Sequence, residues 1–354
     1  GHSHHPSLEV AKGGPMMLAA HGVAGKAGGV FARRAAPVRG GGVPGRSRAH
    51  LTTCASAQKL AVVTGANTGM GKYTAEVLAS KGYEVVMACR DEGKGSLAAR
   101  EVGEATGGSV RFTPLDLGDA ASVAACAGAL VAEGRPVDVL VNNAGIMACP
   151  PWTTADGFEA QMGTNHLGHF ALTLRLLPLL EAAGSEAGRA RVVNVASAAH
   201  KGCAELDVAK LGSLDKEAYV PWGAYGASKA ANILFTRELA RRLEAAGVPV
   251  TANALCPGLV ATDLGRYLVE AAPWWQKPIT SLIIPVMMAR AKGIPDGAST
   301  ALHLALAPEL EGVTGGYFVD SAPFESSDLA QDMDLAARLF TKSEELTGVS
   351  WPST

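Results

Sequence analysis

The protein has 354 residues, enough for one large domain or two small ones, and 48% of them are hydrophobic against 18% charged. This composition permits a substantial core and excludes a disordered polyelectrolyte. The 31 basic and 33 acidic side chains nearly cancel to a formal charge of −2, which argues against a nucleic-acid-binding surface. The six cysteines are scattered singly, as in proteins of a reducing compartment and unlike zinc ribbons or disulfide scaffolds.

The first 58 residues differ in composition from the rest. Residues 1–15 contain three histidines and are interpreted as a tag remnant. Residues 16–58 contain six Lys or Arg residues and no Asp or Glu, a composition typical of organelle-targeting peptides. We interpret them as a chloroplast transit peptide, with the mitochondrion as the alternative destination. An RNA-binding arm is less favoured, because the segment lacks repeated aromatic residues that stack on bases.

From residue 59 onward, short β-branched apolar runs alternate with longer helix-like stretches. The runs predict buried strands at 60–64, 84–89, 109–115, 137–141, 191–196, 250–255 and 316–320. Helices are expected between them, among others at 71–81, 120–133, 158–180 and 224–246. Such alternation implies right-handed crossovers and a parallel sheet covered on both faces. We therefore predict that residues 59–354 form one Rossmann-type doubly wound α/β domain with a mostly parallel seven-stranded sheet.

A glycine-rich turn follows the first predicted strand and opens a helix. Glycines let the backbone approach a pyrophosphate, and a helix N-terminus offers free N–H donors at the positive end of its dipole. In a doubly wound sheet this is the position at which ligands bind. The turn predicts phosphate binding by Gly65, Asn67, Thr68, Gly69, Met70 and Gly71.

The ends of the next strands indicate which dinucleotide binds. Arg90 follows the second strand, where a guanidinium suits a 2′-phosphate and favours NADP(H) over NAD. Lys94 would assist it; a solvated Arg90 beside Asp91 is the alternative. Asp116 follows the third strand and is expected to bind the adenine amino group or, alternatively, to cap the next turn. The remaining predicted cofactor contacts along these strands are Leu117, Asn143, Ala144 and Gly145.

Reactive side chains follow the fifth strand. Ser197 ends that strand, and Tyr225 and Lys229 lie four residues apart on an expected helix, so their side chains share one face. A free phenol has a pKa near 10, and an adjacent ammonium stabilises the phenolate. The pair is therefore a credible proton donor and acceptor. Pro257, Gly258, Val260 and Thr262 follow the sixth strand and are expected to hold the nicotinamide carboxamide.

Taken in order, TGxxxGxG, NNAG, Ser197, YGASK and Pro257-Gly258 resemble the short-chain dehydrogenase/reductases from about residue 59 to residue 320. The strings TGANTGMGK, ACRD, DGFE, TNHLGHF and SKAANILFTRELARRL resemble the retinol-dehydrogenase-like branch, which includes plastid inner-envelope import-associated relatives. The light-dependent protochlorophyllide reductases share the NHLGHF string but differ at NNAG.

The resemblance implies a catalytic tetrad of Asn165, Ser197, Tyr225 and Lys229. In it Tyr225 exchanges a proton with the substrate oxygen, and Ser197 orients that oxygen. Lys229 holds the nicotinamide ribose and depresses the pKa of the tyrosine, while Asn165 positions a water that links Lys229 to solvent. The hydride passes directly between nicotinamide and carbonyl carbon, so no metal is expected, and His166 and His169 are interpreted as packing residues.

The substrate is less clearly indicated than the cofactor. An apolar segment within residues 264–295, containing Trp274 and Trp275, is expected to form a substrate lid. It predicts a lipophilic carbonyl or alcohol substrate: a retinal-like apocarotenoid, a long-chain or reactive aldehyde, or a pigment carbonyl. Peripheral contact with a membrane surface and a homo-oligomer interface are alternative roles for this segment. The alternatives to such an enzyme are an NADP(H)-binding redox-sensing subunit of a plastid complex and a protochlorophyllide-reductase-like enzyme.

Overall fold

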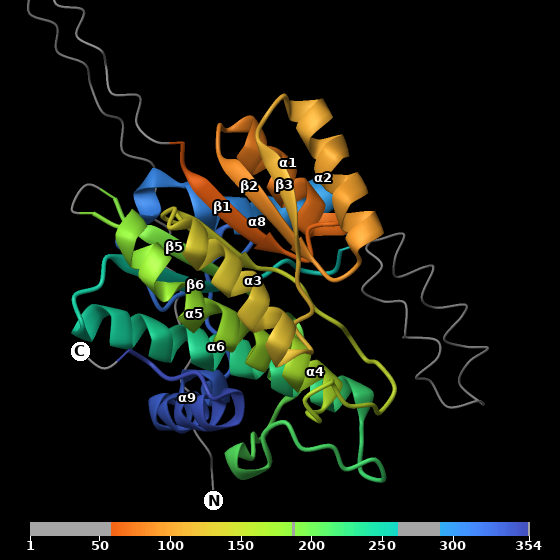
Figure 1. Ribbon diagram of the computed structural model, residues 1–354. Helices are drawn as coiled ribbons and strands as arrows, with labels where there is room; N and C mark the ends of the chain where they lie inside the picture. The colour runs from red at the N-terminus through yellow and green to blue at the C-terminus, as the bar shows by residue number, and fades with distance from the viewer. Residues whose placement is uncertain (1–57, 186–187, 261–290, 353–354) are drawn as a thin grey trace, which may run out of the picture. The chain divides into compact units, whose positions relative to one another are not determined.

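The fold is built on a twisted sheet. The structure, a computed structural model, describes residues 58–185, 188–260 and 291–352. Within these residues, eight strands pair in the order β3-β2-β1-β4-β5-β6-β7-β8 (Figure 1). Strands β1 to β7 run parallel, and β8 pairs antiparallel with β7. Their bounds are β1 Leu60–Thr64, β2 Glu84–Cys89, β3 Val110–Pro114, β4 Val139–Asn142, β5 Ala190–Val195, β6 Val250–Cys256, β7 Tyr317–Val319 and β8 Ala322–Pro323.

The predicted doubly wound α/β domain is confirmed, and one detail of it is wrong. Each of the seven expected strands is present, but the sheet has an eighth, the two-residue β8. It follows a turn in which Asp320 and Ser321 have φ angles of 51° and 63°. Two residues are too few to show any periodicity in a sequence, so this edge strand could not be recognised there.

Helices cover both faces of the sheet (Figure 1). One face is packed by α1 (Gly69–Ser80), α2 (Glu92–Thr106) and α8 (Ile294–Leu306), whose apolar side chains share a core with Val63, Val85 and Val141. The other face is packed by α3 (Ala120–Glu133), α5 (Gly168–Ala183) and α6 (Pro221–Ala245). Helix α9 (Met333–Thr347) packs outside α6. The strands are therefore buried on both sides, as their continuous apolar runs predict.

The helix expected at 158–180 is interrupted. Glu159 caps a three-residue helix, α4 (Ala160–Met162), by accepting from the backbone N–H groups of Gln161 and Met162. A π-helix, η1 (Gly163–Leu167), separates it from α5. Such π segments occur frequently at functional sites, and this one contains Asn165. Helices α1 and α6 begin two and three residues earlier than expected, at Gly69 and Pro221.

Several predicted segments fall outside the described residues. These are the tag remnant at 1–15, all but the last residue of the leader at 16–58, Thr262 and most of the lid at 264–295. The residues flanking the last gap lie together, since Val260 and Lys292 form a parallel bridge. No helix in the described part of the chain is long and apolar enough to cross a membrane.

Candidate active site

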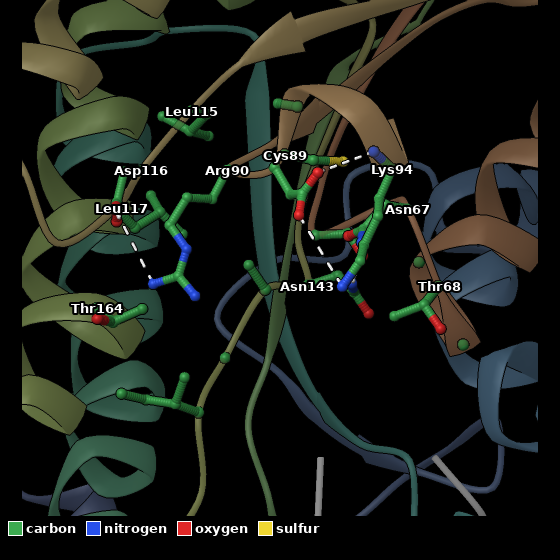
Figure 2. Close-up of a pocket in the computed structure, with 18 of the residues that line it drawn as sticks. Asn67, Thr68, Cys89, Arg90, Lys94, Leu115, Asp116, Leu117, Asn143 and Thr164 are labelled. Carbon is green, nitrogen blue, oxygen red and sulfur yellow. Dashed lines mark hydrogen bonds and ion pairs between the residues drawn. The ribbon is translucent and has the colours of Figure 1, made fainter. Parts of the chain in front are cut away.

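A cavity of about 540 Å³ lies at the carboxyl ends of the strands, where the sheet order reverses between β1 and β4 (Figure 2). Ligands of doubly wound folds bind at this switch point. The cavity brings together the predicted cofactor residues from the first four strands: Gly65, Asn67, Thr68, Gly69, Met70, Gly71, Arg90, Asp116, Leu117, Asn143, Ala144 and Gly145. Asp91, Lys94 and Thr164 also line it.

The glycine turn forms a tight cradle against the Asn143 turn. Gly65 and Gly69 have φ angles of 62° and 55°, a backbone region that residues other than glycine rarely adopt. A Cβ atom on Gly71 would lie 2.5 Å from both the Gly65 carbonyl oxygen and Asn143 Nδ2. Asn143 Nδ2 in turn donates to the Thr64 carbonyl at 2.8 Å. The backbone of the turn is thus fixed beside the N-terminus of α1, as anion binding requires.

Two cationic side chains, Arg90 and Lys94, line the cavity (Figure 2). Arg90 Nη1 lies 4.0 Å from Asp116 Oδ2, and Lys94 Nζ lies 3.9 Å from Asp91 Oδ2. Asp91 also accepts from Lys94 N at 2.9 Å and so caps α2. Asp116 Oδ1 accepts from Gly118 N at 2.9 Å, which is the turn-capping role given as its alternative. The exposed Arg90 and Lys94 are therefore placed to meet an anionic group.

Ser197, Tyr225 and Lys229 converge beyond β5. Ser197 caps a short 3₁₀ helix, η2 (Ala198–Gly202), by accepting from Ala199 N at 3.2 Å, and its hydroxyl lies close enough to the phenol of Tyr225 to lower the pKa of that group. Lys229 Nζ lies 5.7 Å from the centre of the Tyr225 ring and donates to the Val195 carbonyl at 2.9 Å. Both α6 side chains are buried, with 3% of their surface exposed. Three of the four predicted tetrad members therefore form one cluster.

Asn165 lies near Lys229, since a Cβ on Gly145 would lie 3.2 Å from Asn165 Oδ1 and 3.6 Å from Lys229 Nζ, and its amide binds protein groups on both sides. Its Oδ1 accepts from Ile146 N at 2.9 Å, and its Nδ2 donates to the Ile146 carbonyl at 2.9 Å and to Ser228 Oγ at 3.0 Å. Ser228 Oγ donates to the Tyr225 carbonyl at 2.8 Å. The amide of Asn165 thus fastens the turn after β4 to helix α6, one residue from Lys229.

Burial governs the proton affinities of the two central groups. It raises the pKa of Tyr225 to about 12, against a smaller lowering by the hydrogen bond from Ser197. It lowers the pKa of Lys229 to about 8. The expected depression of the tyrosine pKa is thus not a property of the protein without cofactor. At neutral pH Tyr225 carries its proton and can donate it.

Sequence reasoning missed several residues that assemble the site. Thr64 Oγ1 accepts from the backbone N–H groups of Asn143 and Ala144, both at 2.9 Å. A Cβ on Gly226 would lie 2.8 Å from the Ala199 carbonyl, so this glycine allows η2 to pack on α6. Ser228 joins Asn165 to α6. The YGASK motif was the one sequence signal for Gly226 and Ser228, and it did not indicate which residues they contact.

The predicted residues after β6 are only partly described. Pro257 is buried at the end of β6, and Gly258 has a φ angle of 80° beside Lys292. Val260 contacts the start of α8, because a Cβ on Gly297 would lie 2.5 Å from it and 3.1 Å from Met70 Sδ. Val260 therefore borders the glycine turn. None of the three lines the described cavity.

The two neighbouring histidines have protein partners. His166 Nε2 lies 2.8 Å from Ser343 Oγ, and His169 Nε2 lies 2.9 Å from Thr64 Oγ1. Burial lowers the pKa of His166 to about 3 and that of His169 to about 4. Within the described residues, no three His, Cys, Asp or Glu side chains are grouped as metal ligands would be.

A cavity over a glycine turn, next to a buried Ser-Tyr-Lys cluster on a doubly wound sheet, is the arrangement expected of a nucleotide-dependent oxidoreductase. Residues 59–273 match the family of short chain dehydrogenases, and the chain belongs to this family. It is 43% identical over 297 residues to retinol dehydrogenase 12 of Mus musculus, covering 83% of this chain and 87% of that protein. It is 42% identical over 291 residues to polyprenol dehydrogenase of Mus musculus, covering 82% and 84% respectively.

Solved structures share the fold. An uncharacterized protein from Mycobacterium paratuberculosis has a TM-score of 0.63 at 37% identity, covering 84% of this chain and 96% of that one. The NADP complex of RhlG from Pseudomonas aeruginosa has a TM-score of 0.56 at 28% identity, covering 74% and 94%. The resemblance to the retinol-dehydrogenase-like branch is thus confirmed, and the protein is an oxidoreductase of alcohol and carbonyl groups.

Proposed function

We propose that the protein transfers a hydride between NADP(H) and a lipophilic carbonyl or alcohol, with Tyr225 as the proton donor and acceptor. The observation that carries this proposal is the buried phenol of Tyr225, which lies beside Lys229 and is flanked by the exposed indole of Trp222. Retinal-like apocarotenoids, long-chain or reactive aldehydes and pigment carbonyls are the substrate classes in question.

The cavity suits NADP(H). The pyrophosphate would lie on the turn at Gly65–Gly71, where the missing Cβ of Gly71 keeps the cradle tight. Arg90 and Lys94 would hold the 2′-phosphate, while Asp91 caps α2 through Oδ1. The NADP complex of RhlG, a structural neighbour, supports the same cofactor. When bound, NADPH supplies the hydride.

The Ser-Tyr-Lys cluster supplies the proton chemistry. In reduction, the phenol of Tyr225 donates its proton to the carbonyl oxygen, and the Ser197 hydroxyl stabilises the developing negative charge there. Lys229 carries three N–H donors, of which Val195 accepts one, and its charge stabilises the phenolate left behind. In alcohol oxidation the same tyrosine accepts the proton. Asn165 holds the Ile146 turn in place beside this cluster.

Apolar groups beside Tyr225 favour a lipophilic substrate. The Trp222 ring centre lies 6.0 Å from that of Tyr225, and its side chain is 52% exposed. Val220, at the start of the same helix, is 62% exposed. Exposed large apolar groups next to a reactive centre are typical of a binding surface for an apolar ligand. The names of the relatives, retinol and polyprenol dehydrogenase, point to the same class of alcohol.

The test follows NADPH consumption by the purified protein with retinal, a long-chain aldehyde and a short hydrophilic aldehyde. We expect turnover of the lipophilic carbonyls. Tyr225→Phe should lower kcat by about a hundred- to ten-thousandfold, the usual contribution of a general acid, and leave the Kd of NADPH nearly unchanged. Tyr83→Phe is the matched control, because Tyr83 precedes β2 and so lies at the amino-terminal ends of the strands, away from the cavity at their carboxyl ends.

Failure of this test has a definite meaning. If NADPH binds tightly, no carbonyl is turned over and a stable protein complex is recovered, the redox-sensing alternative replaces the enzyme.

We also propose that residues 16–58 direct the chain to the chloroplast, with the mitochondrion as the alternative, on the basis of their basic composition. Imaging this leader fused to a fluorescent protein separates the two destinations.

A further inference from the structure

His169 is a buried polar side chain that the reaction above does not use. It lies in α5, one turn after Asn165, and is 3% exposed. Each of its ring nitrogens faces a polar atom. Nδ1 lies 3.0 Å from the Asn165 carbonyl oxygen, and Nε2 lies 2.9 Å from Thr64 Oγ1.

The chemistry of these partners determines where the protons lie. A carbonyl oxygen only accepts, so Nδ1 carries the proton that faces Asn165. Burial keeps the pKa of His169 at about 4, so the ring is neutral at pH 7 and Nε2 is an acceptor. Thr64 Oγ1 already accepts from Asn143 N and Ala144 N. Its own proton therefore points to Nε2 at 2.9 Å rather than to the Val141 carbonyl at 3.4 Å.

The hydrogen bonds continue beyond Asn165 to the reactive tyrosine. The Asn165 amide hydrogen-bonds both the N–H and the carbonyl of Ile146. It also donates to Ser228 Oγ, which in turn donates to the Tyr225 carbonyl. His169 is thus the one described side chain that joins the Thr64–Asn143 contact under the cofactor cavity to the carbonyl of Asn165. One end of this connection lies under the cofactor cavity, and the other leads through Ser228 to the backbone of Tyr225.

We propose that His169 is a positioning residue that fixes Asn165, and through it the Ile146 turn and Tyr225, relative to the floor of the cofactor cavity. It acts as a neutral ring in the Nδ1–H form, donating to the Asn165 carbonyl and accepting from the Thr64 hydroxyl. Its effect on turnover rests on the carbonyl reduction proposed above. Its effect on the Asn165 contacts does not.

Three substitutions separate the two bonds of the ring. His169→Phe removes both. His169→Asn places an N–H donor where Nδ1 stands, and His169→Gln places a polar atom where Nε2 stands. We expect kcat to fall about tenfold or more in the Phe variant and by a smaller factor in the Asn and Gln variants, each of which keeps one of the two bonds that join Thr64 to Asn165. The Kd of NADPH should change little in all three.

His166→Phe is the matched control. His166 is 0% exposed, lies three residues earlier on the same helical segment and bonds Ser343 on α9 instead of the site. We expect this variant to lose thermal stability to a similar extent as His169→Phe while keeping the wild-type kcat. A wild-type kcat in His169→Phe, or an equal fall in His166→Phe, would each overturn the proposal.

Two measurements decide the proposal without turnover. The ¹⁵N shifts of the His169 ring should report a protonated Nδ1 and a bare Nε2 between pH 6 and pH 8, and the opposite tautomer would refute the assignment. Amide exchange of Ile146, which bonds Asn165 Oδ1, should accelerate in His169→Phe and remain slow in His169→Asn. If the wild-type protein reduces no carbonyl, the proposed function fails, while these two readouts still confirm or refute the role of His169.

Discussion

Asp91 illustrates what a single residue's identity leaves open. In the sequence, the carboxylate of Asp91 after the second strand would favour NAD, whereas the neighbouring Arg90 favours NADP(H). In the structure Asp91 accepts from Lys94 N at 2.9 Å and caps α2. A sequence does not specify whether such a side chain turns toward its helix or toward a ligand, because both directions satisfy the same local pattern.

Arg90 provides the prediction at this scale. Arg90→Ala should weaken NADPH about ten- to hundredfold, the value of a lost charge-assisted hydrogen bond or pair, and leave the affinity for NADH nearly unchanged. Titrations of cofactor fluorescence with both nucleotides measure the two Kd values. Arg100→Ala on α2 is the control, since Arg100 is similarly exposed and pairs with Glu104 away from the cavity. Equal losses for NADPH and NADH would contradict the 2′-phosphate assignment.

Elements were predictable where one local rule dominates. The strands carry continuous apolar runs because they are buried on both faces, and β1 and β2 begin and end where those runs do. The π-helix at Gly163–Leu167 was not predictable, because the segment reads as one helix by periodicity alone. It is tertiary contact that holds it, through the bonds of Asn165 to Ile146 and Ser228.

The packing of η2 on α6 gives the prediction at the scale of elements. Gly226→Ala would place a Cβ 2.8 Å from the Ala199 carbonyl, so η2 must move away from α6 and carry Ser197 from Tyr225. We expect kcat to fall about tenfold or more, as for a lost hydrogen bond in the transition state. Gly223→Ala on the same helix is the control, because its Cβ would meet Val220 at an ordinary 3.5 Å. Equal kcat values for the two variants would refute this reading.

At the scale of the whole molecule, the sheet order explains why so much of the site was predictable. Parallel strands end at one edge, so motifs from residue 65 to residue 258 meet there although the chain separates them widely. What the sequence could not give is the set of contacts that join these motifs. Thr64, Gly226 and Ser228 act through partners on other elements, and a sequence pattern does not name such partners.

The pH dependence of reduction is also a property of the assembled molecule. Burial lowers the pKa of Lys229 to about 8 and raises that of Tyr225 to about 12. Reduction needs both groups protonated, so kcat/KM for the carbonyl should decline as the pH rises through about 8. Alcohol oxidation needs the phenolate and should rise with pH instead. Profiles between pH 6 and pH 10 at saturating cofactor measure both, and a reduction rate that stays level to pH 10 would contradict the assignment.

The exposure of the two cations beside the cavity has a consequence for cofactor choice. The side chains of Arg90 and Lys94 are 71% and 75% exposed, so dissolved ions screen their attraction for a phosphate. We therefore expect the preference for NADPH over NADH to shrink as ionic strength rises, so that a ratio measured in dilute buffer exceeds the one at the salt concentration of a living compartment.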